Sequence, residues 1–173
     1  MEAIRLTSPV SPHAQQAFPR FLGLLEKHNV EYVIVGGYAV GVHGFQRYTG
    51  AMDVFVAISG ENAGRLVEVF SEFGFASLSL KASDFLDPDT VVEAGREPMK
   101  IQVLKGIDGV TFDQCRSDRM IVNISGLEVP FIGFESLLAN KTASPRSKDR
   151  IDLEELTRLR DLQKKREIER EIE

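Results

Sequence analysis

The sequence of 173 residues has one cysteine, no tryptophan and no long apolar run. A single cysteine excludes an internal disulfide framework and a zinc site built from several cysteines. None of the apolar runs approaches the roughly 20 residues that a bilayer-spanning helix needs. The first residues also lack the apolar stretch of a signal peptide. We therefore expect a cytoplasmic protein that does not act in a membrane.

Positive charge is also scarce. The chain has 21 Lys and Arg residues against 26 Asp and Glu residues, which gives a net charge of -5. This balance argues against binding to a polyanion by bulk charge alone, although it is compatible with a local basic patch. The composition, 43% apolar and 27% charged, is typical of a soluble globular protein. The length suits one compact domain with an appended element.

Short apolar runs alternate with amphipathic stretches, and their spacing predicts both strands and helices. Ser125 and Gly126 separate two strands of a predicted hairpin, and Thr111 with Gln114 matches a capping box. The predicted strands are residues 31–35, 52–58, 91–94, 99–104, 120–124 and 128–132, and the predicted helices are 19–28, 38–43, 60–73, 134–140 and 148–173. Hairpins mixed with helices predict an α+β fold with a mixed β-sheet flanked by helices.

Three segments are expected along the chain. Residues 1–12 contain two prolines and are expected to form an irregular N-terminal arm, and residues 13–147 form the folded domain. Residues 148–173 form a long C-terminal helix, and nine of its last 13 residues are charged. This helix is interpreted either as a solvated element stabilised by ion pairs along its surface or as a partner-docking helix.

Residues 33–56, VIVGGYAVGVHGFQRYTGAMDVFV, carry the strongest functional signal. One predicted strand ends in Gly36 and Gly37, and the next carries Asp53 near its start. Glycines at a strand end allow a phosphate to approach the backbone because they have no Cβ, and N–H groups that open a helix attract anions. A carboxylate on the neighbouring strand could hold Mg²⁺ that bridges those phosphates. A Gly-Gly pair by itself is also typical of an ordinary turn.

The order of the motifs resembles the nucleotidyltransferase superfamily, which has the polymerase-beta-like fold. The similarity is to its small bacterial branch of abortive-infection and toxin–antitoxin nucleotidyltransferases, which combines Gly-Gly-Tyr-Ala, His-Gly, Arg-x-Thr and an acidic pair. Here these correspond to GGYA at 36–39, HG at 43–44, RYT at 47–49 and AMD at 51–53. Further similarity lies in residues 100–112, in the Asn-Lys pair at 140–141 and in residues 146–152.

The resemblance implies a metal-dependent transfer of a nucleoside monophosphate from a nucleoside triphosphate to an acceptor hydroxyl, with pyrophosphate leaving. Two or three carboxylates bind two Mg²⁺ ions in the superfamily, and the matching positions here are 51, 53 and 102. The nucleotide-binding residues that it implies are Gly36, Gly37, Tyr38, His43, Arg47, Thr49, Lys141 and Lys148. The acceptor it implies is RNA, such as tRNA, or a protein, and an antitoxin is an expected partner.

Several of these residues also have a plain structural interpretation. His43 can pack locally, and Arg47 can form a surface salt bridge in place of neutralising a phosphate. Lys141, Arg146 and Lys148 can belong to a solvated loop in place of a triphosphate or RNA site.

The sequence departs from the superfamily pattern at two of the three expected carboxylates. Ala51 has no ligand atom in its side chain, and Gln102 offers a neutral amide oxygen. Asp53 is then the one expected metal ligand, and the loss of charged ligands should cost metal affinity heavily. Asp108 and Asp149 could substitute, although the sequence does not place them near a metal.

Two explanations of Ala51 are open at this point: a naturally degenerate site, or the replacement of an aspartate that silences an enzyme. The sequence supports two functional hypotheses. The first is a nucleotidyltransferase whose activity is impaired in this chain by Ala51. The second is a catalytically inactive module that binds a nucleotide or a partner.

Overall fold

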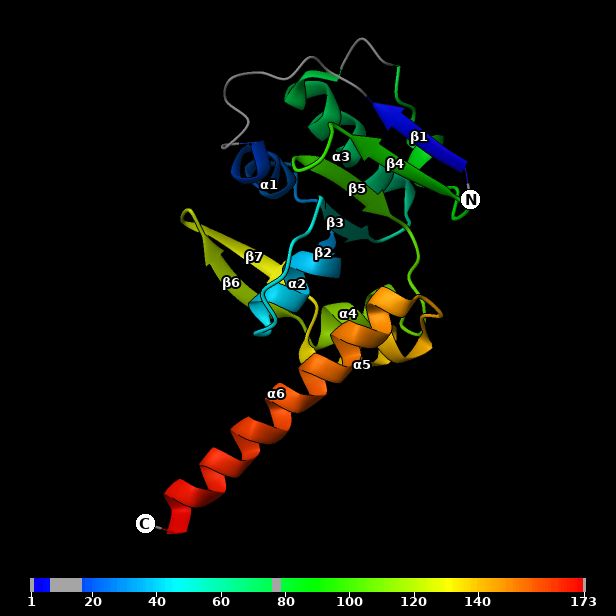
Figure 1. Ribbon diagram of the computed structural model, residues 1–173. Helices are drawn as coiled ribbons and strands as arrows, with labels where there is room; N and C mark the ends of the chain where they lie inside the picture. Colours follow the sequence, from blue (N-terminus) through cyan, green and yellow to red (C-terminus); the bar gives the residue numbers. More distant parts are fainter. Residues whose placement is uncertain (1, 7–16, 76–78, 173) are drawn as a thin grey trace.

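The computed structural model of the chain describes residues 2–6, 17–75 and 79–172. Its centre is one mixed sheet of seven strands in the order β1-β4-β5-β3-β2-β7-β6, with helices packed around it (Figure 1). The α+β class with a mixed β-sheet flanked by helices is confirmed. The strands are β1 Glu2–Leu6, β2 Tyr32–Val35, β3 Ala51–Val56, β4 Thr90–Ala94, β5 Lys100–Leu104, β6 Met120–Ile124 and β7 Leu127–Phe131.

The middle of the sheet brings together the strands on either side of the glycine motif. β2 pairs antiparallel with β3, and β3 pairs in parallel with β5. Their apolar residues are β-branched in large part, which favours strand geometry. Val33, Val54 and Val103 are fully buried. These strands therefore form a stiff core from which the polar residues of β3 project.

The helices of the described residues are α1 Ala17–Lys27, α2 Gly36–Val42, α3 Gly60–Phe70, α4 Phe112–Ser117, α5 Phe134–Ala143 and α6 Ser147–Ile172, with the short helices η2 Ser71–Phe75 and η4 Ala82–Phe85. Aromatic rings join α1, α3 and η4, because the ring centroid of Phe70 lies 5.3 Å from that of Phe21 and 5.6 Å from that of Phe85. Such pairs add to the free energy of apolar burial.

Two local predictions are confirmed. Thr111 and Gln114 form the reciprocal capping box at the start of α4. β6 and β7 form an antiparallel hairpin whose turn residues, Ser125 and Gly126, both have positive φ, at 52° and 84°. This is the backbone geometry that two-residue hairpin turns require.

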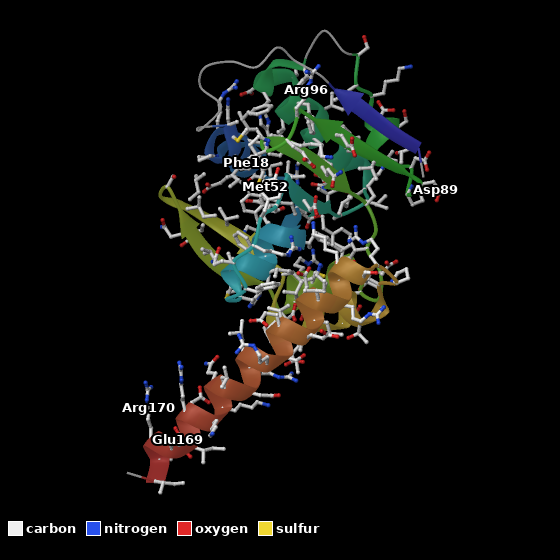
Figure 2. All side chains as sticks on the ribbon, in the orientation of Figure 1. Phe18, Met52, Asp89, Arg96, Glu169 and Arg170 are labelled. Atoms are coloured by element: carbon white, nitrogen blue, oxygen red, sulfur yellow. The ribbon has the colours of Figure 1, made fainter. Side chains whose placement is uncertain are left out.

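Helix α6 differs along its length. Its first turns pack against the domain and bury Leu156, whereas residues 161–172 are all exposed. In Figures 1 and 2 the end of α6 extends away from the sheet, and the side chains of Glu169 and Arg170 lie clear of every other element. None of the helices in the described ranges has an apolar stretch long enough to cross a bilayer.

The N-terminal arm differs from the prediction. Residues 2–6 form β1, which pairs in parallel with β4 from Glu2↔Thr90 to Leu6↔Ala94. The irregular arm was therefore wrong for these five residues, because their partner strand lies more than eighty positions away and a local pattern cannot show such pairing. Residues 1 and 7–12 of the expected arm lie outside the described residues.

Candidate functional site

The glycine motif lies where β2 passes into α2. It leaves space for one side chain of β3 and for one side chain of the loop that precedes β3. Gly36 has φ +70°, and a Cβ added there would lie 2.2 Å from Asp53 Oδ2. A Cβ added at Gly37 would lie 2.6 Å from Thr49 Oγ1. Contacts under 3.0 Å require something to move, so both positions exclude a side chain. The two glycines thus bring the backbone of α2 directly against Asp53 and Thr49.

Asp53 is the acid that this arrangement holds. It pairs in register with Val35 of β2 and Gln102 of β5, so it sits in the centre of the sheet. Its Oδ1 atom is buried and has no hydrogen-bond partner among the described residues. Burial raises the pKa of the Asp53 carboxyl to about 6, and the opposing effect of four nearby cations does not cancel it: Arg146, Lys141, Lys100 and Lys148.

The two positions without the expected carboxylate lie beside Asp53. Ala51 is two residues before Asp53 and therefore on the same face of β3. Gln102 is the register partner of Asp53, and its Nε2 donates a hydrogen bond of 2.8 Å to Glu93 Oε1 on β4. An ionised carboxylate only accepts hydrogen bonds, so the NH₂ group of the Gln102 amide is the end that faces Glu93.

A pocket of about 220 Å³ opens beside Asp53. Its walls come from the β2–α2 junction, the loop after β5, and the turn between α5 and α6. The lining residues are Val35, Gly36, Asp53, Leu104, Gly106, Ile107, Asp108, Asn140, Lys141, Ser144, Arg146 and Asp149. Of the predicted site residues, the structure brings Gly36, Asp53 and Lys141 to this pocket, and it also places there the two substitute acids.

The wall formed by α5 and α6 contains a network of ion pairs whose two acids, Asp149 and Asp152, are buried. Lys141 is 3% exposed, and its Nζ lies 2.6 Å from Asp149 Oδ1 and 2.9 Å from Asp152 Oδ2. Arg47 donates to both oxygens of Asp152, from Nε at 2.6 Å and from Nη2 at 2.7 Å. Arg146 Nε donates to Asp149 Oδ2 at 2.7 Å. The network ties the start of α6 to α5 and to the loop before β3.

In this network, hydrogen bonds lower the pKa values of the two aspartates more than burial raises them. Burial would raise the pKa of the Asp149 carboxyl, but hydrogen bonds from Lys141, Ser144 and Arg146 lower it to about 2. The pKa of Asp152 is also lowered, because bonds from Arg47 and Lys141 outweigh its burial. Both carboxylates are therefore ionised and compensated at neutral pH.

The remaining predicted site residues are not part of the pocket lining. His43 Nε2 lies 2.8 Å from the Ile132 carbonyl oxygen, and its ring packs edge-on against Phe134. The Tyr38 ring packs edge-on against Phe18. Thr49 Oγ1 donates to the Ala51 carbonyl oxygen at 3.0 Å. Gly37, Arg47 and the exposed Lys148 also lie outside the lining, as do Ala51 and Gln102. A nucleotide contact at these positions stays a prediction.

Sequence reasoning missed the partner of Gln102. Glu93 pairs in register with Gln102 because β4 and β5 run antiparallel. The sequence contains a usable signal, since two strands were predicted on either side of residues 95–98, and a hairpin between them would bring residues 93 and 102 opposite each other. The roles of Asn140 and Ser144 in the pocket were likewise not foreseen.

The fold and the Gly36–Asp53 arrangement place the chain among nucleotidyltransferase-like proteins. It belongs to the family described as nucleotidyl transferase of unknown function (DUF2204), whose model matches residues 14–173. No curated protein sequence matches it significantly.

Two solved structures are similar to the chain. One is a candidate nucleotidyltransferase from Thermotoga maritima, with a TM-score of 0.52 at 15% identity, covering 94% of this chain and 96% of that one. The other is an antigenic nucleotidyltransferase-like protein from Paracoccidioides brasiliensis, with a TM-score of 0.48 at 16% identity, covering 88% of this chain and 79% of that one. The first similarity supports the nucleotidyltransferase fold alone.

The family chemistry implies a divalent metal, and the residues can be tested for it. Asp53 lines the pocket and offers carboxylate oxygens, of which Oδ1 has no hydrogen-bond partner among the described residues. Ala51 has no ligand atom, and Gln102 is bonded to Glu93. Among the described residues, no three His, Cys, Asp or Glu side chains gather closely enough to enclose a metal. One carboxylate at the position of Asp53 fits a single cation, and it does not fit two ions held by three carboxylates.

Proposed function

We propose that this chain binds a nucleoside triphosphate with its phosphates in the pocket beside Asp53. The observation that carries this proposal is Asp53, whose buried Oδ1 has no hydrogen-bond partner in the described residues and which lines a pocket together with Lys141 and Arg146. An unpaired buried carboxylate oxygen costs free energy, so its retention favours a ligand-binding role. The family membership supports a nucleotide as the class of ligand.

The basic residues of the pocket have different tasks in this proposal. The Arg146 side chain is 73% exposed, so it can turn from Asp149 to a phosphate and bind it with two parallel hydrogen bonds. Lys141 is buried between two aspartates and keeps the wall in place. Asp53 would hold one Mg²⁺. Bound there, the ion would offset phosphate charge and favour transfer of the nucleoside monophosphate to an acceptor hydroxyl.

The chain as it stands is an impaired transferase in this proposal, because residue 51 is alanine. A carboxylate there would share the face of β3 with Asp53. The acceptor, which we propose to be an RNA such as tRNA or a protein, would lie outside the pocket, since 220 Å³ leaves no room for a macromolecule. An antitoxin partner belongs to the same hypothesis.

Calorimetry with ATP and Mg²⁺ tests the binding step, and the Ala51→Asp variant tests the transfer step. We expect the chain to bind ATP, Asp53→Asn to weaken that binding, and Ala51→Asp to incorporate labelled nucleotide from a triphosphate into cell RNA or protein. Ala51→Asn is the matched control, because it has nearly the same size without the charge. Absence of ATP binding to the chain would contradict the proposed function.

A second candidate is a catalytically inactive nucleotide-binding module. The hydrogen bond between Gln102 and Glu93 favours it, because the amide at position 102 is already engaged on the side away from β3. This candidate predicts that ATP binds equally with and without a chelator. It also predicts that Ala51→Asp shows no incorporation above Ala51→Asn.

A further inference from the structure

One face of the central sheet carries a lysine next to the position that lacks a carboxylate. In β3 the first and third residues, Ala51 and Asp53, are half-buried, and the same holds for Lys100 and Gln102 in β5. The parallel register pairs Ala51 with Lys100 and Asp53 with Gln102. Side chains alternate between the two faces along each strand, so residues in register share a face. These four side chains therefore form one half-exposed surface, on which Lys100 is the direct neighbour of residue 51.

Lys100 lies close enough to Asp53 to act on its charge. The Lys100 ammonium lowers the pKa of the Asp53 carboxyl, although burial raises that pKa more. Glu97 packs against the same end of β3, since a Cβ added at Gly50 would lie 2.5 Å from Glu97 Oε1. Neither Glu97 nor any other described acid places an oxygen within 4.0 Å of Lys100 Nζ. Lys100 is therefore a cation near Asp53 that forms no ion pair within the described residues.

The pocket beside Asp53 is too small for a whole nucleoside triphosphate. Its volume is about 220 Å³, whereas pockets that enclose a drug-sized ligand have about 300–1,000 Å³. Part of such a ligand must then lie outside the lining. The half-exposed face of β3 and β5 borders the pocket, because Asp53 and Leu104 belong to this face and also line the pocket. Lys100 therefore places a positive charge on a surface that the ligand can reach.

We propose that Lys100 binds a phosphate group of the nucleotide on this face and supplies there the positive charge that a second divalent ion would supply. The position of the phosphate rests on the proposed function. A divalent ion depends on charged ligands, and alanine at position 51 removes one, whereas an ammonium group needs none. Lysine has three rotatable donors on a flexible stem, which suits a phosphate oxygen. The same alanine leaves no carboxylate in register with Lys100 that would compete with the phosphate.

Calorimetry of the full chain with ATP, once with Mg²⁺ and once with a chelator, tests the role of Lys100. We expect Lys100→Gln to weaken ATP binding about tenfold or more under both conditions, because one hydrogen bond to a charged group is lost. Lys100→Arg keeps the charge and should retain most of the affinity. The matched control is Lys164→Gln, which removes the same charge from the exposed part of α6 and should leave the affinity unchanged.

Inorganic triphosphate is the second ligand of this experiment, because it has neither base nor ribose. Its affinity should fall by the same factor in Lys100→Gln, and circular dichroism confirms that each variant is folded. Three results would overturn this role of Lys100. They are a Lys100→Gln variant that binds ATP as tightly as the parent chain, a Lys100→Arg variant that loses as much affinity as Lys100→Gln, and a parent chain whose ATP binding disappears with the chelator.

Failure of the proposed function has a different signature. The parent chain would then bind inorganic triphosphate with an affinity that depends on Lys100, but it would not bind ATP. ATP binding that is independent of Lys100 removes only the role of this lysine and leaves the proposed function in place.

Discussion

Two groups of acidic side chains lie at or next to the pocket, and their hydrogen bonding is opposite. On the α5–α6 side, Asp149 and Asp152 accept hydrogen bonds from Lys141, Arg47 and Arg146. On the sheet side, Asp53 has an oxygen with no hydrogen-bond partner among the described residues, and its pKa is raised. Asp53 and Asp149 both line the pocket, and their pKa values move in opposite directions because hydrogen bonds lower that of Asp149 whereas burial dominates at Asp53.

Asp149 and Asp152 stabilise the fold, whereas the ionised Asp53 lowers its stability. The hydrogen bonds to Asp149 and Asp152 stabilise the ionised form of these acids. Each bond between α6 and the loop before β3 also restricts the positions of these two elements. Asp53 is ionised at neutral pH against the effect of burial, and within the described part of the chain no hydrogen bond to Oδ1 offsets that cost. Residues of this kind are typical of ligand sites, where local stability is lower than it could be.

The largest effect should follow from breaking the compensated group. Asp152→Ala leaves Arg47 and part of the charge of Lys141 without a partner, and we expect a loss of about 3–5 kcal/mol in the free energy of unfolding, as for other broken buried ion pairs. Urea denaturation at neutral pH measures it. Asp161→Ala should change stability by less than about 0.5 kcal/mol. A loss at position 152 as small as this control would mean that the network is not a structural tie.

The next largest effect is an increase in the free energy of unfolding. Asp53→Asn should stabilise the protein by about 1–3 kcal/mol near pH 8, because a pKa raised from 3.8 to about 6 means that ionisation of Asp53 opposes folding. Below about pH 4 the carboxyl is protonated in both the folded and the unfolded state, so the gain should vanish there, and it should be complete above about pH 6. Urea unfolding of both proteins across this pH range checks the sign. An equal stability change at both ends would contradict it.

A smaller effect is expected from moving one carboxylate toward Asp53. Gln102→Glu alone places two carboxylates opposite each other across β4 and β5, and we expect a loss of about 1 kcal/mol at neutral pH. Adding Glu93→Gln restores a carboxylate–amide pair and should recover most of that loss. The coupling energy of this double-mutant cycle, measured by urea denaturation, tests the hydrogen bond between the two side chains. The double variant should also bind Mn²⁺ more tightly than the parent chain.

The smallest effect should come from the exposed end of α6. Residues 161–172 are all exposed, in contrast to the first turns of the same helix, which bury Asp149 and Asp152. Ending the chain after Gln163 should leave the free energy of unfolding within about 0.5 kcal/mol and leave ATP binding unchanged. A destabilisation comparable to that of Asp152→Ala would show that this end is packed in solution.

The sequence predicted the elements whose stabilising contacts are local. The β6–β7 turn at Ser125 and Gly126 and the capping box at Thr111 need only neighbouring residues, and both are present. β1 could not be predicted in the same way, because its partner is β4. Within the site, the positions of Gly36 and Asp53 follow from the motif order that the resemblance supplied.

The pairing of side chains in the site could not be predicted from the sequence. Arg47 and Asp152 are 105 positions apart, and no periodicity connects them. Arg47 forms an ion pair with Asp152, but the pair is buried and not on the surface as the sequence suggested, whereas His43 packs locally. Asp108 and Asp149 both reach the pocket, but they differ in partners, which no pattern of acidic residues could indicate.

The close approach of position 36 to Asp53 also sets a rule for sequence divergence. The space that a Cβ at position 36 would need is filled by the Asp53 carboxylate, at 2.2 Å from Oδ2. Related chains should therefore change these two positions together: where residue 36 carries a side chain, residue 53 should be smaller than aspartate. A chain that has lost the acid is then free to lose the glycine, so drift at position 36 would mark members of the family that have abandoned this pocket.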